Sequence, residues 1–88
     1  MDDMLKAPVG TTRMHILAWL REPALAETGA TAEGVAARFG LPRPVALTHL
    51  RLLTAIGLLH ATPLGGRVYY RCDEVRIADV ARRFEKGW

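Results

Sequence analysis

The residues with the clearest chemical potential in this chain are the arginines of its middle segment. Residues 34–72 contain no aspartate, glutamate or lysine, and their net charge is +5 in a chain whose total is +3. The five cations are Arg38, Arg43, Arg51, Arg67 and Arg71. Arginine is always charged and offers a planar fork of donors, so an acid-free group of arginines suits phosphate binding. The alternative is ordinary surface charge without a ligand.

The other reactive residue types are too few or too scattered for a metal site or a catalytic site. Cys72 is the only cysteine, and His15, His49 and His60 share no metal-ligand spacing within one helix or strand. A tetrahedral transition-metal site needs clustered cysteine or histidine. The sequence also has no glycine-rich phosphate loop, nucleophile motif or plausible carboxylate pair. We therefore expect no metal, no cofactor and no enzymatic activity.

Length and composition favour a single small domain over residues 1–88. Half of the residues are hydrophobic, which predicts a globular chain with an apolar excess that suits an oligomer interface. One cysteine, an acidic start and the lack of a long apolar run indicate a soluble cytoplasmic protein without a signal peptide or membrane span. Cys72 is either a redox switch or a small buried hydrophobe, and the second is favoured because cysteine is usually buried.

Start and stop signals predict the elements that must position these arginines. Glu22-Pro23 ends a first helix, Thr31 caps a second, and Gly40 and Gly57 follow the second and third. The expected elements are a flexible arm over 1–10, helices over 12–21, 32–39 and 42–56, a short turn at 24–27, strands over 58–62 and 67–72 joined by residues 63–66, and a last helix capped by Asp73. The fold class is therefore mainly α with a small β-hairpin (α+β), in the order α-α-α-β-β-α.

The second and third helices, joined across Gly40-Leu41, have helix-turn-helix form. In that arrangement the first helix braces the second, whose N-terminal residues enter the major groove of duplex DNA. The hairpin that follows is a wing, so the pattern predicts a winged helix-turn-helix. The residues expected at DNA are Pro42, Arg43, Val45, Thr48, His49, Arg51, Arg67 and Arg71.

These residues have different expected roles. Arg43 and Thr48 are the expected base readers, and Val45 suits a thymine methyl group. Arg51, Arg67 and Arg71 suit the phosphate backbone. His49 is either a phosphate contact or a buried, hydrogen-bonded core histidine.

The run Val35–Leu59 resembles the core of ArsR/SmtB-type regulators. In that family a helix of small residues is followed by leucine and by a second helix, which begins with proline, contains a histidine-leucine pair and ends in alanine, glycine and leucine. Val68-Tyr69-Tyr70-Arg71 is similar to the second wing strand of that family. The resemblance implies a homodimer built through the first and last helices, with Ile16, Trp19, Leu20, Phe84 and Trp88 as interface candidates. The alternative is that these side chains are ordinary core.

The chain departs from the metal-sensing members of that family. The helix at 32–39 lacks their cysteines, and the last helix has Asp79 and Glu85 but no histidine. The leading hypothesis is a dimeric, sequence-specific regulator of transcription that binds double-stranded DNA, most simply a repressor, with no inducer indicated. The alternative is a winged-helix module that docks on protein instead of DNA. A third and weaker hypothesis is a DNA-binding protein with a structural or partitioning role.

The ligand count generates a first prediction. Tag-free protein titrated with zinc in a calorimeter should show no tight stoichiometric binding, because too few soft ligands exist for a tetrahedral set. Submicromolar zinc affinity coupled to release of DNA would contradict this, and would point to a site on the last helix or between subunits.

Overall fold

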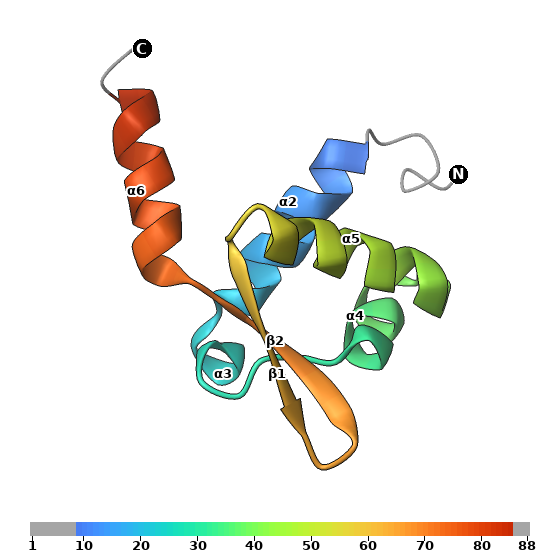
Figure 1. Cartoon of the computed structure of the whole chain (residues 1–88). Coiled ribbons are helices and arrows are strands. Elements are labelled where there is room, and N and C mark those ends of the chain that lie inside the picture. The colour runs from blue at the N-terminus through green and yellow to red at the C-terminus, as the bar shows by residue number, and fades with distance from the viewer. Residues whose placement is uncertain (1–8, 86–88) are drawn as a thin grey trace.

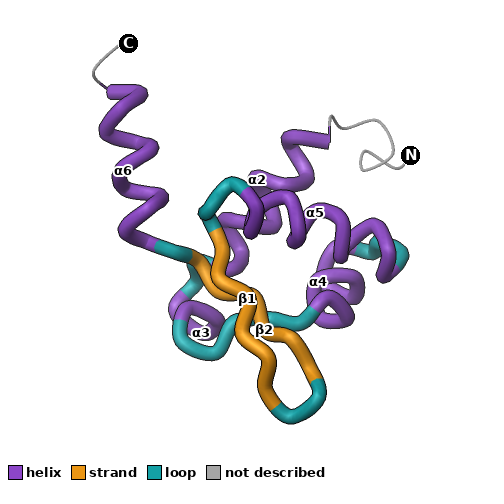
Figure 2. The backbone as a smooth tube through the Cα atoms, viewed as in Figure 1, coloured by secondary structure: helices purple, strands orange, loops and turns teal. Residues whose placement is uncertain are grey.

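The structure, a computed structural model, describes residues 9–85 (Figure 1). Its elements are α2 (Val9–Leu20), α3 (Pro23–Ala26), α4 (Ala32–Phe39), α5 (Arg43–Ala55), β1 (Leu59–Leu64), β2 (Arg67–Cys72) and α6 (Glu74–Glu85). Figure 2 shows how helices predominate and how the hairpin projects from them. The predicted fold class is confirmed, with one short helix, α3, where a turn was expected. Pro23 occupies its first turn, a position that needs no helical N–H.

The predicted caps form as expected. The Thr31 hydroxyl accepts a hydrogen bond from the Gly34 N–H at 3.1 Å, and Gly40 ends α4 in the left-handed conformation. At the start of α6, Asp73 Oδ1 accepts from the Arg76 N–H at 3.0 Å. These contacts pair backbone groups at the helix ends, which have no partner within the helix. Both ends of α4 and the start of α6 were therefore readable from sequence.

Two boundaries differ from the prediction by more than one residue. The first helix already includes Val9 and Gly10, so the described end of the expected arm is helical, while residues 1–8 lie outside the described part. Pro63 and Leu64 belong to β1, and only Gly65-Gly66 forms the turn. Both glycines have positive φ, at 58° and 78°, which a two-residue hairpin turn of this hand requires.

The core forms where α2, α4 and α5 meet beneath the hairpin. Ile16, Leu20, Val35 and Leu50 are its largest fully buried side chains. Tyr70, near the end of β2, is also buried and joins the same cluster. Burying such side chains stabilises a small domain by about 1.5–3 kcal/mol each. The core therefore fixes α5 against α4 and holds the base of the hairpin.

A backbone pairing ties the hairpin to the connection between α3 and α4. The Ala30 N–H donates to the Tyr70 carbonyl at 3.1 Å, and the Tyr70 N–H donates to the Ala30 carbonyl at 2.8 Å. Gly29 makes this approach possible, because its φ is 77° and a Cβ there would lie 2.6 Å from the Tyr70 carbonyl oxygen. Sequence patterns gave no sign of this pairing, since a single bridging residue has no periodicity.

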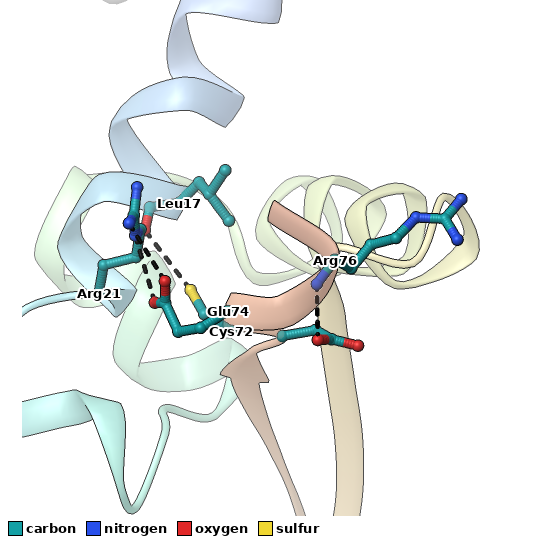
Figure 3. Close-up of polar contacts among 6 residues, drawn as sticks. Leu17, Arg21, Cys72, Glu74 and Arg76 are labelled. Atoms are coloured by element: carbon teal, nitrogen blue, oxygen red, sulfur yellow. Dashed lines mark hydrogen bonds and ion pairs between the residues drawn. The ribbon is translucent and has the colours of Figure 1, made fainter. Parts of the chain in front are cut away.

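Helix α6 leaves the hairpin and extends away from the other elements (Figures 1 and 2). Its base is held by an ion pair between Arg21 and Glu74 at 3.1 Å, drawn in Figure 3. Ile77 packs against the core, whereas Val75 is 82% exposed. In the described part of the chain, no helix has both the length and the apolar character that a membrane crossing needs.

His49 is a polar residue inside this core, and it generates a prediction about stability. Its side chain is 6% exposed, and its Nδ1 has no hydrogen-bond partner among the described residues. Burial, and secondarily the charge of Arg13, lower the pKa of His49 below its ordinary value of 6.5. The folded chain therefore keeps His49 neutral at pH values where the unfolded chain takes up a proton.

The free energy of unfolding should consequently fall as the pH drops below about 6.5, until the folded-state pKa of His49 is passed. Urea unfolding of the parent and of His49→Gln between pH 7.5 and 5 measures this effect. The variant should show a flatter pH dependence, whatever its absolute stability. His15→Gln, at an exposed position of α2, is the control and should behave like the parent. An equal slope in His49→Gln and the parent would contradict the assignment.

Candidate nucleic-acid interface

Helix α5 has a core face and two exposed flanks. Ala46, His49, Leu50 and Leu53 recur at helical spacing and are buried. This face meets α4 and the base of the hairpin. Because the core face is fixed, the remaining positions of α5 divide into the flank beside the wing and the flank away from it.

The flank beside the wing carries two arginines. Arg43, Leu47 and Arg51 follow one another at intervals of four residues and so lie along one side of α5. They line a hollow of about 210 Å³, whose opposite wall is formed by the start of β2 with Arg67. We call this the arginine hollow. It brings together three of the five arginines of the acid-free segment, from two elements separated in sequence.

Glu33, in the first turn of α4, also lines the arginine hollow. The Nε of Arg43 donates to Glu33 Oε2 at 2.6 Å. This hydrogen bond is the main cause that lowers the pKa of Glu33, and the charge of Arg67 acts in the same direction. Sequence reasoning missed this pair, because the two residues are ten positions apart and lie on different helices. The available signal was that both residues open consecutive helices of a helix-turn-helix.

The other residues predicted on α5 differ in their exposure. Pro42 is the N-cap residue and is exposed. Thr48 is exposed, and its hydroxyl donates to the Pro44 carbonyl at 2.9 Å, which leaves the hydroxyl oxygen free to accept. Val45 is 41% exposed on the flank away from the wing, together with Leu52 and Ile56. These positions are accessible to a partner, and they do not line the arginine hollow.

Two residues predicted at DNA lie outside the arginine hollow. His49 is buried on the core face of α5, which favours the core alternative over a phosphate contact, although its Nδ1 has no hydrogen-bond partner among the described residues. Arg71 lines a second hollow, of about 510 Å³, beside Glu27 and Tyr69. Its Nη1 donates to the Glu27 carbonyl at 3.0 Å. The spacing of arginines in the sequence could not show that Arg71 and Arg67 line different hollows.

The interface candidates of α2 are largely engaged within the chain. Ile16 and Leu20 are fully buried, so the core alternative describes them in this conformation. Trp19 is half-buried, meets the ring of Phe39 edge-on at 5.8 Å between centroids, and lies under the Arg38 guanidinium. The side chain of Phe84, and Trp88 altogether, fall outside the described residues.

Cys72 and the possible metal ligands give no reason to place the functional site elsewhere. The Cys72 thiol is half-buried and faces the Leu17 carbonyl at 3.7 Å (Figure 3). Burial, reinforced by the charge of Glu74, raises the pKa of Cys72 to about 11, so its reactive thiolate form is disfavoured at neutral pH. Within residues 9–85 as described, no three His, Cys, Asp or Glu side chains gather in a group that could hold a metal ion.

Comparison with known proteins gives matches to solved structures. No protein-family model and no curated protein matches the chain. An ArsR-like transcriptional regulator from Rhodococcus sp. RHA1 is 28% identical over 86% of this chain and 67% of its own, with a TM-score of 0.70. A possible transcriptional regulator for arsenical resistance is 28% identical over all of this chain and 86% of its own, with a TM-score of 0.75.

A third match adds a statement about assembly. The homodimeric winged helix-turn-helix DNA-binding domain of a possible ArsR-family regulator from Mycobacterium bovis is 27% identical over 89% of this chain and 75% of its own, with a TM-score of 0.62. The predicted resemblance in fold and sequence is thereby confirmed.

Proposed function

We propose that this chain, which shares the winged helix-turn-helix fold of ArsR-family transcriptional regulators, is a homodimeric, sequence-specific DNA-binding regulator that acts in the cytoplasm as a repressor by occluding a promoter. The observation that carries the proposal is the arginine hollow, in which Arg43 and Arg51 of α5 meet Arg67 of the wing. A group of cations shared between a recognition helix and a wing suits contact with the phosphates and base edges of a groove.

The first turn of α5 supplies base readout in this proposal. Arg43 is the first residue of α5 and its side chain is 56% exposed. Two donors of its guanidinium can pair with O6 and N7 of guanine in the major groove. Thr48 and Val45 lie within the next turns and are exposed, so that they suit a base edge and a thymine methyl group.

Arg51 and Arg67 supply charge for the backbone. Arg51 lies eight residues after Arg43 on the same flank, where a helix docked by its N-terminus has moved toward the phosphates. Arg67 begins β2 directly after the Gly65-Gly66 turn, so it stands near the wing tip. Neutralising phosphates in this way releases counterions and makes binding depend on salt.

The homodimer rests on α6 and on the comparison. Helix α6 extends away from the other elements (Figure 1), and Ile77, Val80, Ala81 and Phe84 recur at helical spacing along it. Apolar residues at this spacing form a stripe along one side of a helix, and such a stripe suits a second copy of the chain. The Mycobacterium bovis domain of similar fold is homodimeric. Two copies would present two recognition helices to two half-sites.

Docking on protein is the second candidate function, and one observation favours it. Val45, Leu52 and Ile56, on the flank of α5 away from the wing, are each at least 41% exposed. Ile56 and Met14 also line a shallow apolar groove between α5 and α2. An apolar strip on a recognition helix suits a protein partner better than phosphate. The arginine hollow on the opposite flank favours DNA.

A set of alanine variants tests the DNA proposal. A duplex selected from a random pool and a random duplex are titrated at several salt concentrations. Arg43→Ala should weaken the selected duplex far more than the random one, because a bidentate guanine pair is worth about 1–3 kcal/mol of discrimination. Arg51→Ala and Arg67→Ala should weaken both duplexes about equally and reduce the salt slope by about one phosphate each.

Arg71→Ala is the matched control for Arg67→Ala, because both residues belong to β2 and only Arg67 lines the arginine hollow. We expect its effect to be the smaller. Thermal melting must show that each variant keeps its fold. If the selected-to-random ratio is unchanged in Arg43→Ala, the helix is placed wrongly on DNA; if every variant binds like the parent, protein docking is the better proposal.

The dimer has its own test in sedimentation velocity. The parent should sediment at about twice the monomer mass of 9.7 kDa, because the apolar stripe of α6 suits a second copy of the chain. Phe84→Glu, within that stripe by sequence, should shift the equilibrium toward monomer, whereas Arg82→Glu, whose side chain is exposed, should not. A parent that stays monomeric at tens of micromolar and still binds DNA as one unit would refute the dimer.

A further inference from the structure

Glu33 is the one acidic residue among those that line the arginine hollow. A carboxylate at a surface built for phosphate opposes binding, because like charges repel across a few ångströms. Its pKa is lowered, chiefly by the hydrogen bond from Arg43, so the group is ionised at neutral pH. The position of Glu33 therefore needs a reason other than affinity for a polyanion.

Stability of the fold gives no sufficient reason. The side chains of Arg43 and Glu33 are 56% and 62% exposed, and exposed ion pairs contribute little to stability. A first-turn acid does favour the dipole of α4, but that effect does not depend on contact with Arg43. What the contact does determine is the orientation of the guanidinium.

The geometry leaves Arg43 ready for a second partner. Glu33 Oε2 accepts from Nε at 2.6 Å, which engages one edge of the planar guanidinium. The end of the group that carries the two Nη nitrogens points away from an acceptor bound at Nε, and it still offers paired donors. An arginine held in this way presents a fixed fork, which loses less conformational freedom when it pairs with a planar bidentate acceptor such as guanine.

We propose that Glu33 is a specificity-determining positioning residue, which orients Arg43 for guanine readout and opposes the pairing of Arg43 with phosphate. The inference rests on the proposed DNA-binding function. The charge of Glu33 lowers the affinity for any duplex. The fixed orientation of Arg43 offsets this loss only at a site where Arg43 pairs with guanine. The selected-to-random ratio is the quantity that Glu33 raises.

The test compares Glu33→Gln and Glu33→Asp with the parent on the selected and random duplexes. Glu33→Gln should bind random duplex more tightly and lower the selected-to-random ratio about three- to tenfold, a part of what a bidentate pair supplies. Glu33→Asp keeps the charge and shortens the reach, so it should lower the ratio without tightening random binding. Glu22→Gln, an exposed glutamate outside the hollow, should match the parent.

A double-mutant cycle separates positioning from general repulsion. In an Arg43→Ala background, Glu33→Gln should still tighten random binding but should no longer change the ratio. The inference is overturned if Glu33→Gln changes the selected-to-random ratio equally in both backgrounds. It is also overturned if the parent prefers the selected duplex and Glu33→Gln leaves that preference unchanged. In both cases the DNA-binding function stands. If the parent binds no duplex, the proposed function fails and the inference fails with it. Thermal melting confirms that each variant is folded.

Discussion

The two backbone hydrogen bonds between Ala30 and Tyr70 are the constraint on which the arrangement of the surface depends. They join the loop before α4 to the second half of β2, so the wing has a fixed origin relative to the helix-turn-helix. Tyr70 is buried and therefore anchors the same strand in the core. A two-stranded hairpin by itself is only marginally stable in water. The bridge at Tyr70 and the buried Leu59 of β1 together hold the base of the hairpin against the helices, and so place Arg67 opposite Arg43 and Arg51.

The same geometry determines where the positive charge lies on the surface. The segment 34–72 has a net charge of +5, but folding divides its arginines among different surroundings. Three line the arginine hollow, Arg38 lies over aromatic rings, and Arg71 faces the second hollow. Net charge alone describes attraction to a polyanion at long range. In the proposed function, this division separates the three arginines that would contact DNA from Arg38 and Arg71, and Glu33 adds a local opposing charge.

Much of this fold was readable from sequence, because its helices carry strong local signals. Thr31, Gly40 and Asp73 mark helix ends through their own hydrogen bonds or φ. The base of the wing was not readable, since the Ala30–Tyr70 bridge depends on contact between distant residues. For the same reason the sequence could not place His49 in the core rather than at DNA, or pair Glu33 with Arg43. Spacing shows which residues share a face of one helix, and packing decides what that face meets.

Binding of duplex DNA at the arginine hollow, as proposed, can be tested directly by an NMR titration of isotope-labelled protein. With the selected duplex added, backbone amide shifts should concentrate at residues 43–51 and 65–68, with little change at Glu27 and Thr28 beside the second hollow. The shifts should diminish as salt is raised, because phosphate contacts release counterions. Shifts centred instead on Met14, Leu52 and Ile56, or no shifts at saturating duplex, would contradict the account.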